Sequence, residues 1–454
     1  MNNFFNLSLL FSLILLNFSY SQDLVLPLDN EGDNSIIVDE TNYEMELVFE
    51  DKNIIWSIEF FEDNSILAAV KSGSIFHYKD GEKTEIKGLP EIYLRGQGGL
   101  MDLAFHPNFK ENRWLYFSYA SEYEGEKGGN TTIARAKLIE DSLEDLEILY
   151  KGTPNSTKGQ HFGGRLEFDN EGYLYFAIGD RGNRNVNPQD LSLDGGKIYR
   201  INDDGSIPMD NPFFDTPNAR KAIYSYGHRN PQGMFKHPLT GKIWTNEHGP
   251  RGGDEINIIR KGKNYGWPKI TYGINYSGTT ITKNKSLPGM EQPLYYWLPS
   301  IAPSCFEYIS SDMYPNWKGS LLAGALVFKY VERIGLKDDK VVYRSKIAEG
   351  LGRPRDVKQG PDGLIYVAIE NKGVYKILAK YKFAQGYDLS KFNLFDPYPS
   401  AVLKEYNEQV GSFAELSYIN TDTVTDKYKV LAVSYTHLRA HETEADLVCR
   451  LLLE

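Results

Sequence analysis

Short apolar segments alternate with polar turns along most of the chain. One unit recurs, made of an apolar strand, a turn rich in Asp, Asn, Pro or Gly, and a second strand rich in aromatic residues. Copies begin at Ile58, Leu103, Leu166, Met234 and Val357, with a fainter copy at Gly319. Each copy predicts a β-hairpin. Similar hairpins repeated in one chain indicate a radial repeat, so the expected fold is all-β, a six-bladed β-propeller.

The spacing of the copies is uneven. Long insertions follow the hairpins at Leu166 and Met234, and these insertions hold most of the polar motifs. In a propeller, the loops between blades gather at one end of the central channel. We therefore expect His161, Arg229, Gly249 and Arg353, which are far apart in the sequence, to meet there. A binding propeller with a polar rim and no chemistry fits the same pattern, because a fold does not decide function.

The N-terminal residues differ from the repeat. The uncharged apolar run from Asn2 to Ser21 ends in Ser-Tyr-Ser, which predicts a cleaved signal peptide over residues 1–21. Residues 22–45 are acidic and weakly patterned, and we interpret them as an arm before the propeller at 46–380. The remainder of the chain has no second run apolar enough to cross a bilayer. The expected location is therefore the periplasm or the outside of the cell, without a stable membrane anchor.

The C-terminal residues also lack the repeat. Residues 381–433 form a segment of uncertain nature. The run at 434–454, SYTHLRAHETEADLVCRLLLE, resembles translated sequencing-adapter sequence, and we interpret it as non-native. The alternative is a real amphipathic helix that closes the chain. Under the first interpretation, Cys449 and the two histidines of this run are not ligands.

Composition and short motifs exclude several classes of function. The chain has 454 residues and a formal net charge of -11, with no stripe of Lys and Arg, which argues against nucleic acid as a partner. Two cysteines, Cys305 and Cys449, do not make a disulfide framework. No CxxC, HExxH or Walker-type loop is present, so zinc and nucleotide chemistry have no support. These features favour a protein that handles small molecules.

The stretch 223–268 is too rich in polar residues and glycine for a packed core, and predicts loops around a ligand. In YGHRNPQG, Arg229 and Asn230 offer a planar cation and an amide for carboxylates and carbonyls. In NEHGPRGGDE, Gly249 and Pro250 expose main-chain carbonyls near acidic residues, as calcium requires. The alternative is a pair of solvated turns.

A second candidate group surrounds the hairpin at Leu166. His161, in GQHFGGR, stands at the entrance of this hairpin and is able to take a proton near neutral pH. Asp180, at the end of the same hairpin, is placed to orient the imidazole. A purely structural histidine in a glycine-rich turn is the alternative.

Two further loops precede strands of the repeat. Gln97 lies in RGQGGL, directly before a predicted strand. Arg353 and Arg355 lie in GRPRD before the last hairpin, and share one face if that loop is extended. In that case both guanidinium groups reach the channel. The alternative is that one of them only braces Asp356.

Long motifs carry a resemblance to a known family. RGQGGLMDLAFHPNF, QHFGGRLEFDNEGYLYFAIGDRG, YSYGHRNPQGM, NEHGPRGGDEINIIRKGKNYGWP and RPRDVKQGPDGLIYV occur in this order. They resemble the soluble quinoprotein sugar dehydrogenases, the glucose/sorbosone and aldose sugar dehydrogenase group that uses pyrroloquinoline quinone (PQQ). The resemblance covers about Leu47 to Ile377.

The resemblance implies a propeller that holds PQQ over its channel and oxidises aldoses at the anomeric carbon to lactones. His161 matches the general base that removes the anomeric hydroxyl proton while hydride passes to quinone C5, and Asp180 matches the acid that orients it. By the same resemblance, Arg229 has two roles, as a catalytic residue beside this pair and as a contact of the quinone. The implied cofactor-binding residues are Gln97, His161, Arg229, Asn230, Arg353 and Arg355. The carbonyls of Gly249 and Pro250 match the Ca²⁺ ligands, and an external acceptor takes the electrons.

Two positions depart from the family. Val327 follows Ala325-Leu326 where members often have a lysine that contacts the quinone, and the nearest cation is Lys329. Gln160 stands before the base where some members have Asp. The specificity of such a shallow site depends on loop shape, and Tyr295 and Trp297 are expected to line it.

Two other functions are possible for a propeller with this sequence. A non-enzymatic propeller of the hedgehog-interacting type would lack the site, whereas this chain keeps His161, Gln97, Arg229 and the Gly249-Pro250 pair. A propeller lactonase would bind calcium through carboxylate and Asn side chains. The Arg-rich loops suit an anionic quinone better than such a site.

Overall fold

The computed structural model describes residues 37–38, 43–123, 125–314, 316–337 and 340–379. The predicted signal peptide, most of the predicted arm, the 381–433 segment and the 434–454 tail lie outside the described residues.

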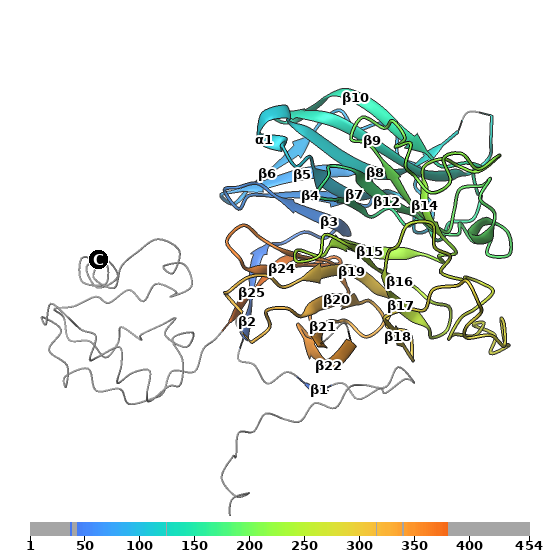
Figure 1. Cartoon of the computed structure of the whole chain (residues 1–454). Helices are drawn as coiled ribbons and strands as arrows, with labels where there is room; N and C mark the ends of the chain where they lie inside the picture. Colours follow the sequence, from blue (N-terminus) through green and yellow to red (C-terminus); the bar gives the residue numbers. More distant parts are fainter. Residues whose placement is uncertain (1–36, 39–42, 124, 315, 338–339, 380–454) are drawn as a thin grey trace, which may run out of the picture.

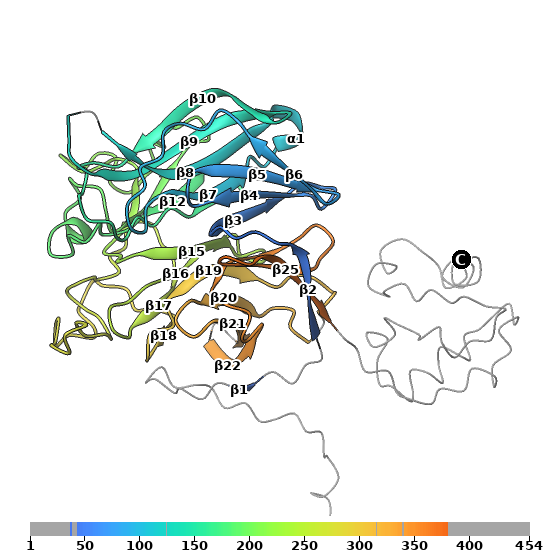
Figure 2. The same cartoon turned by 180° about the vertical axis from the view of Figure 1, so that it is seen from behind.

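The described chain forms six antiparallel β-sheets arranged as the blades of a propeller (Figures 1 and 2), which confirms the predicted fold. Each blade contributes one innermost strand. These strands are β3 (Ile55–Phe60), β7 (Leu100–Phe105), β11 (Leu166–Phe168), β15 (Pro231–Lys236), β19 (Pro303–Tyr308) and β23 (Pro354–Gln359). They contact one another in this order, and β23 contacts β3, so the ring around the channel is closed.

The other strands of each blade follow outward in chain order. They are β4 (Ile66–Val70), β5 (Ser74–Lys79) and β6 (Glu82–Ile86); β8 (Trp114–Glu122), β9 (Gly129–Ile139) and β10 (Ser142–Lys151); β12 (Leu174–Ile178), β13 (Lys197–Ile201) and β14 (Ile223–Tyr226); β16 (Ile243–Glu247), β17 (Asp254–Ile258) and β18 (Tyr295–Trp297); β20 (Leu321–Ala325), β21 (Tyr330–Lys337) and β22 (Lys340–Ile347); and β24 (Ile365–Ile369) and β25 (Gly373–Ala379).

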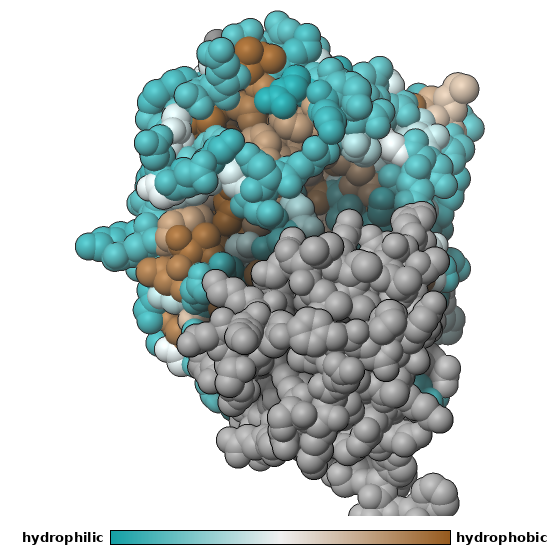
Figure 3. Space-filling view, turned by 90° about the vertical axis from the view of Figure 1, so that its left-hand side faces the viewer, coloured by the Kyte–Doolittle hydropathy of each residue, from teal (hydrophilic) through white to brown (hydrophobic). Residues whose placement is uncertain are grey.

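Burial differs between the inner and outer strands of several blades, and this difference produces the pattern seen in the sequence. The second strands β4, β12, β20 and β24 are buried at every position because neighbouring blades cover both of their faces. The outer strands β6 and β10 are mostly exposed and carry charged residues. The side drawn in Figure 3 is accordingly polar over much of its described surface, with smaller apolar patches between.

Apolar cores fill the spaces between neighbouring blades. One core joins the first and second blades through residues such as Leu67 and Phe117, and another joins the fourth and fifth through Trp244 and Tyr330. Because every blade is packed on both sides, no blade has a complete core of its own. We therefore infer that the propeller folds as a single unit.

A strand from the N-terminal side closes the ring. β2 (Tyr43–Phe49) pairs antiparallel with β25 and becomes the outer strand of the last blade, with Met45 opposite Ile377. β1 (Ile37–Val38) pairs in parallel with β22 at the edge of the fifth blade. Chain segments from the two ends of the described region are therefore joined in one sheet (Figure 1).

The fifth blade differs from its sequence prediction in one detail. The faint copy at Gly319 covers β20 and β21, whereas the first hairpin of this blade is β19–β20. Residues 309–320 lengthen the turn between these two strands and hide the hairpin in the sequence. The insertions predicted after the hairpins at Leu166 and Met234 are also present, as residues 202–222 and 259–294.

Helix is scarce in the part of the chain that the structure describes. α1 (Phe109–Asn112) and the 3₁₀ turn η1 (Asn187–Gln189) are each about one turn long. Among the described residues, none of the helices has the length and apolar character that a membrane crossing requires.

Arg165 joins all six blades at the channel. It directly precedes β11 in the third blade and donates hydrogen bonds to Gln232 O and Ser304 O of the fourth and fifth blades. The same guanidinium forms ion pairs with Asp102 (3.0 Å) of the second blade and Asp356 (2.9 Å) of the sixth. It also lies over the ring of Trp56 in the first blade, 4.4 Å from the centroid.

Candidate functional site

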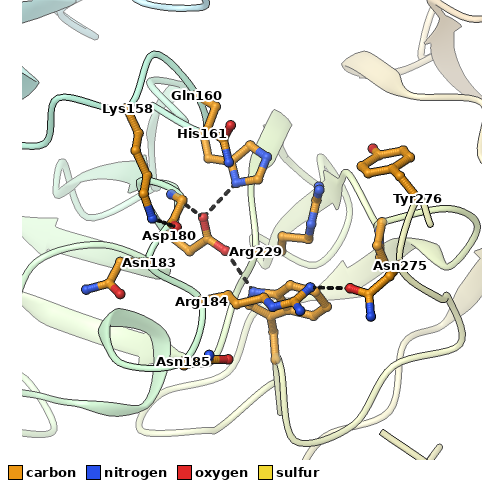
Figure 4. Close-up of a pocket in the computed structure, with 13 residues that line it drawn as sticks. Lys158, Gln160, His161, Asp180, Asn183, Arg184, Asn185, Arg229, Asn275 and Tyr276 are labelled. Atoms are coloured by element: carbon orange, nitrogen blue, oxygen red, sulfur yellow. Dashed lines mark hydrogen bonds and ion pairs between the residues drawn. The ribbon is translucent and has the colours of Figure 1, made fainter. Parts of the chain in front are cut away.

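A polar cavity of about 340 Å³ lies among the loops of the third and fourth blades (Figure 4). Its walls come from the β10–β11, β12–β13, β14–β15, β16–β17 and β17–β18 loops. The first three bring His161, Asp180 and Arg229 together, and the fourth brings Pro250. Of the four residues expected to meet, His161 and Arg229 line this cavity, whereas Gly249 and Arg353 are not among its lining residues.

His161 and Asp180 form a hydrogen-bonded pair at the cavity. The distance from His161 Nδ1 to Asp180 Oδ1 is 2.6 Å (Figure 4). Asp180 also accepts hydrogen bonds from Gly182 N (2.7 Å) and from Trp267 Nε1 (2.9 Å). A carboxylate with three donors is held in its ionised, accepting form. Nδ1 of His161 therefore carries the hydrogen, and Nε2 keeps a lone pair.

The pKa values of this pair agree with that assignment. Burial lowers the pKa of His161, and the nearby Arg229 cation lowers it further, although the hydrogen bond to Asp180 acts in the opposite direction. Burial alone would raise the pKa of Asp180, yet its bonds with His161 and Trp267 and the charge of Arg229 lower it overall. Near neutral pH, the pair is a neutral imidazole beside a carboxylate, which is the form of a general base and its orienting acid.

The backbone around His161 is fixed by Gln97 and Arg181. His161 has φ of 57°, in the left-handed region, and its N–H donates to Gln97 Oε1 at 2.6 Å. Arg181 is 1% exposed, donates to Gln160 O and Gly129 O, and lies 3.4 Å from the centroid of the Phe162 ring. A non-glycine residue in this conformation needs such support. Gln97, predicted as a cofactor contact, is not among the lining residues of the cavity, and here its side chain holds the backbone of His161.

A buried carboxylate holds the loop of Arg229 and Asn230. Glu247, 3% exposed, accepts hydrogen bonds from Arg229 N (2.6 Å), Asn230 N (3.4 Å) and Asn257 Nδ2 (3.0 Å). His228 Nδ1 also lies 3.0 Å from Glu247, while its Nε2 bonds Ser225. This Ser-His-Glu arrangement is fully buried, so it is a support for the loop and not a nucleophile.

Arg229 and Asn230 differ in their surroundings. The Arg229 guanidinium lines the cavity and donates to His248 O at 2.9 Å. Asn230 is fully buried behind the wall, with its Oδ1 accepting from Gly163 N. Its Nδ2 has no hydrogen-bond partner within the described residues. A buried amide hydrogen without a partner is unfavourable, and indicates a missing acceptor.

Gly249 and Pro250 form the β16–β17 corner. Both are buried, and Pro250 lines the cavity. Gly249 N donates to Asp254 (2.7 Å), whose pKa burial raises to about 6. Within the described chain, no hydrogen bond reaches the carbonyl oxygen of either Gly249 or Pro250. No cluster of His, Cys, Asp and Glu side chains that could hold a metal occurs in the described ranges.

Arg353 and Arg355 are not in the cavity wall. Both pair with Glu370, Arg353 at 2.7 Å. Arg353 also donates to Leu326 O (3.0 Å), which lies beside the divergent Val327. Val327 is 53% exposed, and it occupies the position where family members often have a lysine. The quinone contacts of Arg353 and Arg355 therefore stay predictions. The replacement of the family lysine by Lys329 also stays a prediction.

The prediction that Tyr295 and Trp297 line the site was wrong. Both are 1% exposed and lie in the core between the fourth and fifth blades. Trp297 Nε1 donates to Glu332 (3.2 Å), and Tyr295 accepts from Arg344 (2.9 Å). They belong to β18, the outer strand of its blade, and the next blade covers them.

Sequence reasoning missed several residues of the cavity. They are Lys158, Gly182, Asn183, Arg184, Asn185, Trp267, Asn275 and Tyr276. Trp267 lies in the NYGWP motif, but its bond to Asp180 depends on the path of the 259–294 insertion. This insertion runs along β14, where Tyr265 N bonds Tyr226 O (2.8 Å) and Trp267 N bonds Gly227 O (2.8 Å). A path of this kind has no local sequence signal.

Comparisons with known proteins agree with this geometry. The family model described as glucose/sorbosone dehydrogenase matches residues 52–378. The chain is 42% identical over 320 residues to the aldose sugar dehydrogenase YliI of Escherichia coli (strain K12), covering 69% of this chain and 86% of that protein.

Solved structures give the same result. The apo-form of the soluble aldose sugar dehydrogenase from Escherichia coli has a TM-score of 0.71 at 37% identity, covering 75% of this chain and all of that one (100%). The PQQ-bound aldose sugar dehydrogenase from Streptomyces coelicolor has a TM-score of 0.61 at 25% identity, covering 74% of this chain and 98% of that one. The protein therefore belongs to the glucose/sorbosone dehydrogenase family.

Proposed function

We propose that this protein is a PQQ- and Ca²⁺-dependent dehydrogenase that oxidises aldoses at the anomeric carbon to lactones. The observation that carries the proposal is the His161–Asp180 pair, a neutral imidazole with an open Nε2 in a cavity lined by cations. Removal of a hydroxyl proton by a positioned histidine is a common element of alcohol oxidation.

The charges of the cavity fit an anionic cofactor. Lys158, Arg184 and Arg229 line it, with Asp180 as the one carboxylate among the lining residues. PQQ carries three carboxylates and an ortho-quinone, which require cationic and amide donors. The unpartnered Asn230 Nδ2 beside this wall is a further donor that an acceptor would satisfy. We infer that Arg229 and Asn230, with Gln97, Arg353 and Arg355 on neighbouring loops, hold the quinone.

The calcium site would rest on the β16–β17 corner. Ca²⁺ prefers oxygen ligands, backbone carbonyls among them. The carbonyl oxygens of Gly249 and Pro250 have no hydrogen bonds within the described chain, so they are available as ligands. Two carbonyls alone make a weak site. The ion would therefore bind together with the anionic quinone, and not before it.

The residues of the chain then have separate tasks. His161 Nε2 takes the proton of the anomeric hydroxyl, and Asp180 holds the ring and stabilises the resulting imidazolium. The Arg229 guanidinium offers positive charge near the oxygen that loses this proton. When bound, PQQ supplies the acceptor for the hydride leaving C1, and Ca²⁺ polarises the accepting carbonyl. Electrons then leave for an external acceptor.

We further propose that the protein acts in the periplasm or outside the cell. This rests on the apolar run over residues 1–21 alone, which lies outside the described residues.

Reconstitution tests the proposed function. The purified protein is mixed with PQQ and Ca²⁺, and reduction of an artificial dye is followed with a panel of aldoses. We expect activity that requires both additions and that EDTA abolishes. Dye reduction without PQQ, or quinone binding with no oxidation of any aldose, would contradict the proposal.

The pH dependence gives a separate prediction. Because burial lowers the pKa of His161 below its ordinary 6.5, the imidazole stays neutral at pH 7 and is protonated only in more acidic solution. Protonation removes the lone pair, so kcat/KM for an aldose should be constant near neutrality and fall as the pH drops below 6.5. Initial rates across the pH range measure this limb. A fall that already begins well above 6.5 would exclude a histidine with a lowered pKa as the base.

A further inference from the structure

Trp267 connects the 259–294 insertion to the His161–Asp180 pair. Its indole Nε1 donates to Asp180 Oδ2 at 2.9 Å, whereas Asp180 Oδ1 bonds His161 Nδ1 and Gly182 N. Within the described chain, no second hydrogen bond reaches Asp180 Oδ2. One oxygen of this carboxylate therefore holds the base, and the other oxygen depends on the indole.

The backbone of Trp267 is anchored on both sides. Trp267 N donates to Gly227 O at 2.8 Å, and Trp267 O accepts from Gln189 Nε2 at 2.9 Å. Gln189 is bound in turn to Asn264 by two amide hydrogen bonds of 3.0 and 2.9 Å. The Trp267 side chain is also buried in the cavity wall. The indole N–H therefore has a fixed direction, and it fixes the carboxylate to which it donates.

A donor on Asp180 Oδ2 also changes how the pair binds a proton. A hydrogen bond to an ionised carboxylate stabilises the ionised form, and the bond from Trp267 is one of the causes that lower the pKa of Asp180. A carboxylate that shares its charge with an indole N–H attracts the imidazolium form of His161 less strongly. Trp267 therefore keeps Asp180 ionised and also limits how tightly His161 takes up a proton.

Several other charged or titratable groups surround His161, through electrostatic interaction or as residues of the same cavity wall. Besides Asp180, they are Arg181, Arg229, His248, Lys158, Arg184 and Tyr276. They come from the β10–β11, β12–β13, β14–β15 and β16–β17 loops and from the insertion. A substitution confined to the Trp267 side chain leaves all of them in the sequence, so its effect on His161 reports the indole.

On the basis of the proposed function, we propose that Trp267 is a positioning residue for the general base. Through Asp180, it fixes the tautomer of His161 with hydrogen on Nδ1 and sets how readily Nε2 accepts the anomeric proton. Trp267 acts by its bond to Asp180 and does not itself transfer a proton. The insertion of the fourth blade thus completes a catalytic pair whose two members belong to loops beside the third blade.

Trp267→Phe tests this positioning role, because it keeps a ring in the wall and removes only the N–H donor. Asp180 then bears more negative charge toward His161, so the pKa of His161 should rise. The acidic limb of kcat/KM in the PQQ- and Ca²⁺-loaded protein should therefore move to higher pH by about 0.5–1 unit. An unchanged limb, or a limb that moves to lower pH, would overturn the proposal.

Trp297→Phe is the matched control. Trp297 Nε1 donates to the buried Glu332 at 3.2 Å in the core between the fourth and fifth blades. This variant loses the same kind of bond between an indole and a carboxylate, but outside the cavity. Its acidic limb should stay at the wild-type position. A limb that moves equally in both variants would show a general effect of losing a buried bond, and would also overturn the proposal.

A second readout requires neither turnover nor a stable variant at position 267. ¹⁵N NMR of the full wild-type chain without PQQ is recorded across the pH range, with resonances assigned from His161→Ala and Trp267→Phe. We expect the indole N–H resonance of Trp267 to titrate with the same midpoint as the ring nitrogens of His161. If this occurs but no aldose is oxidised, the proposed reaction fails and the positioning role stands. A Trp267 resonance that ignores the titration of His161 would overturn the positioning role.

Discussion

The His161→Ala variant will lose its aldose oxidation by about 10²–10⁴-fold in kcat, because alanine offers no acceptor for the anomeric proton. His161 makes its backbone bond to Gln97 through the main chain, which the substitution keeps. Its side chain contributes one hydrogen bond, to Asp180, and Asp180 retains Gly182 and Trp267 as donors. Folding and quinone binding should therefore persist. Steady-state dye reduction and equilibrium dialysis of PQQ measure the two properties.

A matched histidine variant serves as the control. His77 lies on β5, outside the cavity lining, and bonds Ser65. His77→Gln should keep kcat close to the wild-type value. If kcat of His161→Ala also stays near the wild-type value while its quinone is fully bound, His161 is not the base.

Arg165→Leu will lower the free energy of unfolding by about 3–5 kcal/mol, the effect expected when one member of a buried ionic group is removed. Arg165 is 3% exposed, and its two acids, Asp102 and Asp356, are each about as buried. Burial already raises the pKa of Asp356, although the charge of Arg165 opposes this. When the guanidinium is removed, both carboxylates stay buried and lose the cation that they share. Urea unfolding followed by circular dichroism measures the change.

An exposed arginine provides the comparison for Arg165. Arg260 is 58% exposed at its side chain and pairs with Glu291 at 2.6 Å. Arg260→Leu should change the free energy of unfolding by no more than about 1 kcal/mol. The loss in Arg165→Leu should also shrink in acid, because burial raises the pKa of Asp356 and protonation of this carboxyl removes its charge. Equal effects for the two variants would show that the Arg165 contacts do not hold the blades together.

Much of the propeller could be predicted because its repeat is local. Turn residues between an apolar and an aromatic strand mark a hairpin wherever they occur, as at Leu166 and Met234. The fifth blade was placed one strand late because residues 309–320 lengthen its first turn. Pairing of β2 with β25 joins residues more than three hundred positions apart, and no local pattern specifies such a partner.

The candidate site also has one part that the sequence could predict and another part that it could not. His161, Asp180 and Arg229 stand next to strand ends of the repeat, so the fold itself brings them to one place. Trp267 and Tyr276 arrive on an insertion whose route depends on its hydrogen bonds with β14 and Arg184. The assignment of Tyr295 and Trp297 failed for a different reason. Aromatic residues suit both a sugar site and a core between blades, and only the neighbouring blade decides between these environments.

The most direct test of the central claim is a single turnover. The protein is loaded with PQQ and Ca²⁺, an aldose is added without oxygen or dye, and the quinone absorbance and the lactone are measured together. The proposed function predicts that the quinone is reduced and that lactone appears in equal amount, with neither change in His161→Ala. A quinone that is bound but stays oxidised in the wild-type protein, with no lactone formed from any aldose tested, would contradict it.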